Sequence, residues 1–198
     1  RLRLGGVMTH AGSSYELNTP EALAGLAEQE RYLCLKAANR LRAANIACDQ
    51  VSVGSTPTAL SAQGLEGVTE VRAGVYIFFD LVMANVGVCQ LDDIALSVLT
   101  TVIGHQREKG WAIVDAGWMA MSRDRGTQKQ TIDYGYGQVC DLNGQPIPNY
   151  QLISANQEHG IITTRPGTDA PLPDLRIGDR VRILPNHACA TGAHPHLQ

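Results

Sequence analysis

The pattern of apolar and polar positions changes near residue 85 of this 198-residue chain. Before that point, three apolar runs predict short buried strands, namely LRLGGVMTH, QVSVG and VRAGVYIFFD. A helical pattern separates the first two runs, and GSTPTAL after the second predicts a turn and a short helix. Strands that alternate with helices in this way are typical of parallel β/α units.

The start of the long helix is marked by Asn18-Thr19-Pro20-Glu21. A capping hydroxyl, a proline in the first turn and an acid near the positive helix end all favour helix initiation. The apolar residues that follow recur at the helical period, and we expect them to share one face: Leu23, Leu26, Leu33, Ala37 and Leu41.

After about Asn85 the helical pattern disappears. Four runs predict strands between Gly, Pro and Asp turns: DIALSVLTTVIGH, GWAIVDAGW, QLISANQEHGIIT and DRVRILP. Met119 and Met121 are expected in the core. The predicted fold class is therefore α/β plus β, with residues 1–85 as the end of an α/β unit and residues 86–198 as a β-rich domain. A complete (β/α)8 barrel takes about 250 residues, so the first part could hold only its last strands and helices.

Composition and charge exclude several classes of protein. The net charge of −3 argues against nucleic acid as a partner, because phosphate binding needs a concentrated basic surface. The longest apolar stretch, VYIFFDLVMANVGVC, is interrupted by Asp80 and Asn85 and is too short to span a membrane. The five scattered cysteines favour a reducing compartment, and no signal peptide is visible at the N-terminus. We therefore expect a cytoplasmic protein.

A candidate anion site follows the second strand, in VSVGSTPTAL. Gly54 permits close approach of a ligand, Ser55 and Thr56 offer hydroxyl and backbone N–H groups, and Pro57 opens a helix. The same residues also suit an ordinary capped turn, and the sequence alone leaves both interpretations open.

A candidate metal site lies near the C-terminus, where His187 and Cys189 are separated by one residue. In an extended segment these side chains point the same way, and imidazole with thiolate suits zinc or another borderline-soft ion. The alternative is a buried cysteine beside a surface histidine. His194 and His196 lie close in sequence, but we expect them to be exposed to solvent.

Other polar residues have spacings that name no reaction. We retain them as candidates for lining a site: His10, Ser13, Ser14, Asp115, Asp124, Glu158 and His159.

Six segments together carry a resemblance to a known family: GGVMTHAGSSYE, VSVGSTPTA, EVRAGVYIFFD, DAGWMAMSRDRG, NQEHGI and PNHACAT. In this order they resemble the C-terminal half of the D-serine dehydratase-like enzymes, which include D-threonine aldolases. The resemblance implies an alanine-racemase-like barrel that binds pyridoxal 5'-phosphate, followed by a β-rich domain with a metal site. It also implies a homodimer.

The resemblance assigns roles to particular residues. Arg72 falls where related racemases place an arginine near the pyridine nitrogen. His187 and Cys189 match the metal ligands, with Zn, Mn, Mg or Co as the divalent ion. The cofactor-binding positions are Tyr15, which lies beside the cofactor, and the phosphate-binding Ser55, Thr56, Gly74 and Val75.

The implied reaction is dehydration of a β-hydroxy D-amino acid, such as D-threo-3-hydroxyaspartate or D-serine, to a 2-oxo acid and ammonia. Lys36, Lys109 and Lys129 do not match the family's Schiff-base lysine, so we expect that residue in a missing N-terminal half of the same enzyme. The alternatives are a retro-aldolase that acts on the same kind of substrate and a non-catalytic fragment.

Overall fold

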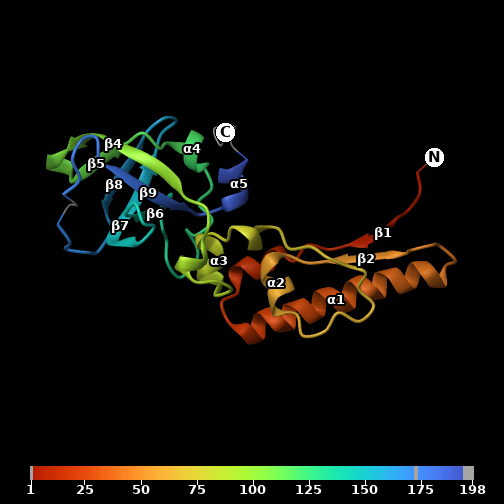
Figure 1. Cartoon of the computed structure of the whole chain (residues 1–198). Helices are drawn as coiled ribbons and strands as arrows, with labels where there is room; N and C mark the ends of the chain where they lie inside the picture. Colours follow the sequence, from red (N-terminus) through yellow and green to blue (C-terminus); the bar gives the residue numbers. More distant parts are fainter. Residues whose placement is uncertain (1, 172–173, 194–198) are drawn as a thin grey trace. The chain divides into compact units, whose positions relative to one another are not determined.

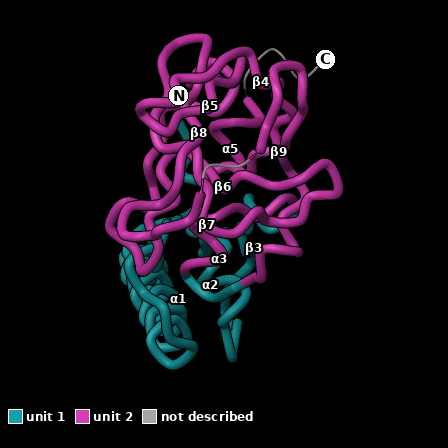
Figure 2. Tube along the Cα trace, turned by 90° about the vertical axis from the view of Figure 1, so that its left-hand side faces the viewer, with its two compact units in different colours: residues 1–77, 86–88 teal, residues 78–85, 89–198 magenta. Residues whose placement is uncertain are grey.

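The computed structural model describes residues 2–171 and 174–193 (Figure 1). The chain divides into two compact units (Figure 2): unit 1 comprises Arg1–Ile77 and Val86–Val88, and unit 2 comprises Phe78–Asn85 and Cys89–Gln198. In the described ranges, no helix is both long enough and apolar enough to cross a membrane.

Unit 1 contains a parallel three-stranded sheet in the order β1-β2-β3. The strands are β1 (Gly6–Met8), β2 (Gln50–Val53) and β3 (Glu70–Val71), and the long helix α1 (Pro20–Ala43) connects the first two. The short helix α2 (Thr56–Ser61) lies between β2 and β3, and 3-10 turns η1 (Gly12–Glu16) and η2 (Val75–Ile77) follow β1 and β3. The predicted β/α alternation is therefore present, with α1 running along one side of the sheet (Figure 1).

Helix α1 begins where the sequence predicted. Thr19 is its N-cap and accepts a hydrogen bond from the backbone N–H of Ala22, and Pro20 opens the first turn. The predicted buried face is wrong in part: Leu23 is buried, but Leu33 and Ala37 are exposed, and Leu26 and Leu41 are half-buried. The buried residues of the helix are Leu23, Ala27, Glu30, Cys34 and Ala38.

The predicted strand VRAGVYIFFD is also wrong over most of its length. Only Val71 of this run lies in β3; the Arg72 N–H still donates to the Val53 carbonyl at 2.8 Å, and η2 follows at Val75. The backbone N–H of Val75 donates to the Thr56 hydroxyl instead of to a neighbouring strand. Tyr76 and Ile77 are 50% and 61% exposed, so these apolar residues do not form the buried strand that their pattern indicated.

Unit 2 is a closed barrel of six strands in the order β4-β5-β8-β7-β6-β9 (Figure 1). Its strands pair antiparallel throughout, and the β7–β8 turn makes a hairpin. The elements are α3 (Leu81–Val86), η3 (Leu91–Asp93), β4 (Val98–Gln106), η4 (Arg107–Lys109), β5 (Trp111–Val114), α4 (Trp118–Met121), β6 (Gly137–Cys140), β7 (Pro146–Ala155), β8 (Gly160–Thr164), β9 (Arg180–Pro185) and α5 (Ala188–Gly192).

The barrel interior is apolar and densely packed. Val114, Leu152, Ile162 and Ile183 are all fully buried there. Of the two methionines expected in the core, Met121 is buried and Met119 is 36% exposed. The run QLISANQEHGIIT, predicted as one strand, forms parts of both β7 and β8, and strand β6 was not predicted.

Candidate functional site

The candidate anion loop follows β2 in unit 1. Gly54 has φ +126°, and a Cβ added there would lie 2.4 Å from the carbonyl oxygen of Arg72. Only glycine fits this conformation and this close approach. Ser55 is then the N-cap of α2 and forms a reciprocal capping box with Thr58.

Three segments of unit 1 meet at this loop. The hydroxyls of Ser14, in η1, and Ser55 are 3.1 Å apart, and both residues are buried. The backbone N–H of Val75 donates to the Thr56 hydroxyl at 3.1 Å. The structure therefore brings together the segments that contain the five predicted cofactor-binding residues. Tyr15 lies next to Ser14, and its hydroxyl is 3.4 Å from the His10 ring.

The loop retains unused donors for an anion. In the part of the chain that the structure describes, the backbone N–H groups of Thr56 and Gly74 have no hydrogen-bond acceptor. A Cβ added to Gly74 would meet nothing within 4 Å, so the space beside it is open. Two free N–H groups and nearby hydroxyls fit a phosphate group.

Glu30 of α1 also contacts this loop, a contact that the sequence did not predict. It is 7% exposed. Its carboxylate accepts hydrogen bonds from the Thr9 hydroxyl at 2.8 Å, the Gly54 N–H at 3.0 Å and the Thr58 hydroxyl at 2.9 Å. The only sequence signal was an acid spaced at the helical period between Ala27 and Cys34.

Arg72, which the family resemblance places near the cofactor, is engaged within the sheet. Its Nε donates to the Ser52 hydroxyl at 2.8 Å, and its guanidinium also donates to the Thr9 carbonyl. These contacts link β1, β2 and the end of β3.

The candidate metal pair lies at the end of β9 in unit 2. His187 is the N-cap of α5, and Cys189 is the second residue of that helix. The expectation of an extended segment is therefore wrong, because the chain turns into a helix directly after His187. Cys189 is exposed, and the His187 side chain is 43% exposed. Both are accessible to an ion from solvent.

Two aspartates contact the segment that holds this pair. Asp124 Oδ2 lies 2.6 Å from His187 Nδ1. Asp80 Oδ2 accepts from the backbone N–H of Ala188 at 3.0 Å, and its Oδ1 accepts from the N–H of Met83. Asp124 was retained as a candidate from the sequence, whereas Asp80 was missed.

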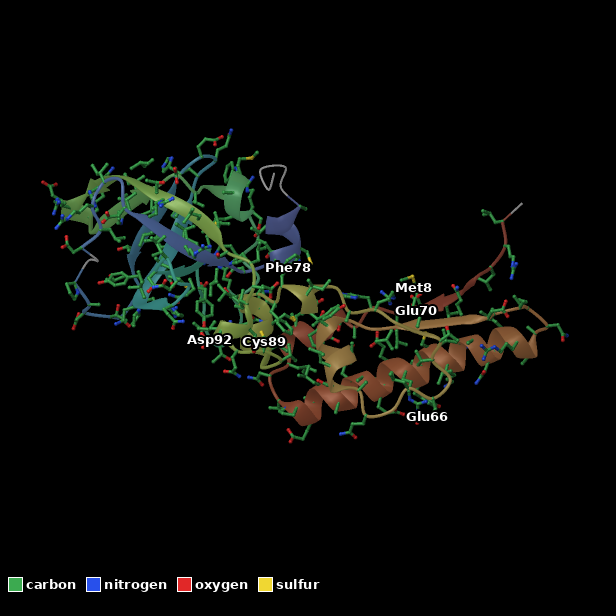
Figure 3. The ribbon with its side chains drawn as sticks, viewed as in Figure 1. Met8, Glu66, Glu70, Phe78, Cys89 and Asp92 are labelled. Atoms are coloured by element: carbon green, nitrogen blue, oxygen red, sulfur yellow. The ribbon has the colours of Figure 1, made fainter. Side chains whose placement is uncertain are left out.

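Burial raises the pKa of several groups in unit 2. Desolvation raises the pKa of Asp80, although the N–H groups of Ala188 and Met83 oppose the shift. Partial burial and the nearby Asp80 raise the pKa of the Cys189 thiol. Cys89, labelled in Figure 3, is buried, and desolvation with the nearby aspartates raises its pKa to about 12. This cysteine is therefore a thiol at neutral pH.

The remaining candidates have structural contacts. Asp115 accepts from the Thr100 hydroxyl and the Thr101 N–H within the barrel. His159 contacts Asn156 at the β7–β8 turn. Ser13 and His10 are exposed, and Glu158 is paired with Gln157 at the same turn. His194 and His196 lie outside the described residues.

A metal ion at this site would have few protein ligands. Over residues 2–171 and 174–193, no group of three or more His, Cys, Asp or Glu side chains is placed to hold an ion. His187 Nε2 and the Cys189 thiol would thus supply two ligands and leave positions open. An imidazole and a thiolate are a donor set that fits a borderline-soft divalent ion.

Comparison with known proteins agrees with this two-part architecture. Residues 1–82 match the alanine racemase N-terminal domain, and residues 95–197 match the putative serine dehydratase domain. The fold is therefore alanine-racemase-like in its first part and continues into the six-stranded barrel. The chain belongs to the putative serine dehydratase domain family.

Two curated relatives are dehydratases. The chain is 68% identical to D-threo-3-hydroxyaspartate dehydratase of Delftia sp. (strain HT23), over 97% of this chain and 51% of that protein. It is 30% identical to D-serine dehydratase of Dictyostelium discoideum, over 95% of this chain and 48% of that protein. The chain thus spans about half the length of these relatives.

Solved structures of D-threo-3-hydroxyaspartate dehydratase share the fold. A histidine-to-alanine variant superposes with TM-score 0.92 at 66% identity, covering 98% of this chain and 50% of that one. A cysteine-to-alanine variant, described as the metal-free form, gives TM-score 0.90 at 66% identity, with 98% and 52% coverage.

Proposed function

We propose that the protein containing this chain is a dehydratase that depends on pyridoxal 5'-phosphate and a divalent metal. Its substrate would be a β-hydroxy D-amino acid, with D-threo-3-hydroxyaspartate the first candidate, and its products a 2-oxo acid and ammonia. The observation that carries this proposal is the 68% identity to D-threo-3-hydroxyaspartate dehydratase over 97% of the chain.

Unit 1 would hold the cofactor. The free N–H groups of Thr56 and Gly74 and the hydroxyls of Ser55 and Thr56 would bind its phosphate, with Val75 completing the loop. Tyr15 would lie beside it on η1. Pyridoxal phosphate supplies an electron sink for bond breaking at the α-carbon. Residues 1–85 would then be the last strands and helices of a (β/α)8 barrel, with residues 86–198 as the metal-carrying domain.

Unit 2 would hold the metal through His187 and Cys189. The two substituted residues of the relative's variant structures lie two positions apart, as His187 and Cys189 do. A divalent ion supplies a Lewis acid that makes the substrate's β-hydroxyl a better leaving group. The thiolate favours zinc or cobalt over magnesium.

The lysines of this chain lie elsewhere. The Lys36 ammonium lies 5.8 Å from the Tyr32 ring on α1, and that of Lys109 lies 4.7 Å from the Trp111 ring. Lys129 is exposed between α4 and β6. We propose that the lysine that bonds the cofactor belongs to an N-terminal half that is not part of this chain. The homodimer is likewise a proposal, as is the cytoplasmic location, which the five free thiols support.

Product analysis tests the proposed reaction. The full-length protein that contains this chain is incubated with D-threo-3-hydroxyaspartate and, separately, with D-serine. Dehydration releases a 2-oxo acid and ammonia in equal amounts. Release of glycine and an aldehyde would instead identify a retro-aldolase, and absence of turnover with either substrate would leave a non-catalytic protein.

A further inference from the structure

We infer that Asp124 is a positioning residue that orients His187 for metal binding. The inference rests on the proposed metal site and adds a residue to it. Asp124 Oδ2 and His187 Nδ1 are 2.6 Å apart. An ionised carboxylate only accepts hydrogen bonds, so Nδ1 carries the proton in this contact. The lone pair of His187 is then on Nε2, which has no other partner among the described residues.

Asp124 is itself held in place by its backbone. Its N–H donates to the Ser122 hydroxyl at 3.2 Å, and its carbonyl accepts from the Asn186 side-chain amide at 3.1 Å. Asn186 is 2% exposed and also donates to the Gly135 carbonyl at 2.7 Å. Because Asn186 directly precedes His187, this amide ties the loop that carries Asp124 to the histidine it faces.

The backbone of the ligand segment is fixed separately by Asp80. Its carboxylate accepts from the N–H of Ala188, which lies between the two metal ligands. Asp80 is 1% exposed, and its carboxylate is hydrogen-bonded to the backbone N–H groups of Ala188 and Met83, not to the His187 ring. Asp80 therefore sets the position of the segment, while Asp124 sets the rotation and tautomer of the imidazole.

The expected changes in stability and in metal affinity distinguish a positioning role for Asp124 from a merely structural one. The side chains of Asp124 and His187 are 38% and 43% exposed, so water competes for their hydrogen bond, which adds only about 1 kcal/mol to stability. A carboxylate that orients a metal-binding histidine instead changes metal affinity by about 10–100-fold when it is removed. Loss of affinity without loss of stability is therefore the signature of the positioning role.

The test is cobalt binding to the metal-depleted full-length protein. Co²⁺ is titrated and followed by its ligand-field and thiolate charge-transfer absorption, which reports binding at Cys189 without reference to activity. We expect Asp124→Ala to weaken binding about 10–100-fold and to move the thermal midpoint by no more than about 3 °C. Asp124→Asn retains an acceptor for Nδ1 and should lose only part of the affinity.

The matched control is Asp133→Asn. Asp133 lies on the same stretch of chain and pairs with Arg125 at 3.0 Å, with no contact to His187, so this variant should bind cobalt as the wild type does. Wild-type cobalt affinity in Asp124→Ala would overturn the positioning role of Asp124 and leave the proposed metal site unaffected. A wild-type protein that binds no cobalt would overturn the proposed metal site and this inference with it.

Discussion

Replacement of Glu30 by alanine should loosen the candidate phosphate loop. The buried carboxylate accepts three hydrogen bonds, two of them from Gly54 N–H and the Thr58 hydroxyl, which are also buried. Thr58 can turn its hydroxyl toward the Ser55 carbonyl, 3.4 Å away, but the Gly54 N–H has no alternative acceptor in the described structure.

The size of the effect follows from these contacts. An unpaired buried N–H costs about 1–3 kcal/mol, and the one lost methylene adds about 0.8 kcal/mol. Loss of the hydrogen bonds from Thr9 and Thr58 is offset by removal of the carboxylate's own desolvation cost, so we expect a net loss of about 2–4 kcal/mol. Glu30→Gln keeps the shape and one acceptor oxygen, so it should lose only about 1 kcal/mol.

Hydrogen exchange by mass spectrometry measures this loss locally. In the full-length protein, amides in residues 50–61 should exchange about 100-fold faster in Glu30→Ala, which corresponds to about 3 kcal/mol. Glu28→Ala is the matched control, because Glu28 lies on the same helix, is exposed and pairs with Arg31 on the helix surface. Exchange in Glu30→Ala within threefold of the wild type would refute the reasoning.

Three further predictions concern other parts of the chain. Gly54→Ala should destabilise unit 1, since its φ is +126°, whereas Gly25→Ala in open space on α1 should stabilise by about 0.5–1 kcal/mol in thermal unfolding. Maleimide labelling of Cys189 should be slow at neutral pH and accelerate as pH rises, because burial and the nearby Asp80 raise its thiol pKa and keep the reactive thiolate scarce. Bound metal should protect Cys189, and equal labelling with and without metal would contradict the proposed metal site. Leu152→Ala, in the barrel core, should cost about 2–5 kcal/mol in denaturant unfolding, while Leu142→Ala, 48% exposed, should leave the midpoint unchanged.

Local signals were enough to predict the start of α1 and the turn after β2. Capping by Thr19 and Ser55 depends on neighbouring residues only, so the sequence carries it directly. The buried face of α1 could not be predicted in the same way. Glu30 is buried because it meets Gly54 and Thr58, and these partners are 24 and 28 residues away.

Short apolar runs were the least reliable basis for predicting strands. The run from Val71 to Asp80 has the composition of a buried strand, but β3 ends at Val71 and the chain turns at Val75. Strand β6 was missed because Gly137 and Gln138 lack the apolar alternation of a typical strand. Its burial comes from closure of the barrel between β7 and β9.

The candidate metal site shows the same limit. The spacing of His187 and Cys189 is visible in the sequence, but Asp124 and Asp80 lie 63 and 108 residues from the groups they contact. Only the fold brings them to this segment. The roles of His187 and Cys189 as ligands remain predictions that rest on the family resemblance and on the donor set.

The central claim is tested most directly by the mass of the full-length protein after borohydride reduction, followed by peptide mapping. We predict one added reduced pyridoxal phosphate on a lysine other than Lys36, Lys109 and Lys129. An unchanged mass, or an adduct on one of these three lysines, would contradict the proposed cofactor site and the division of the enzyme into two halves.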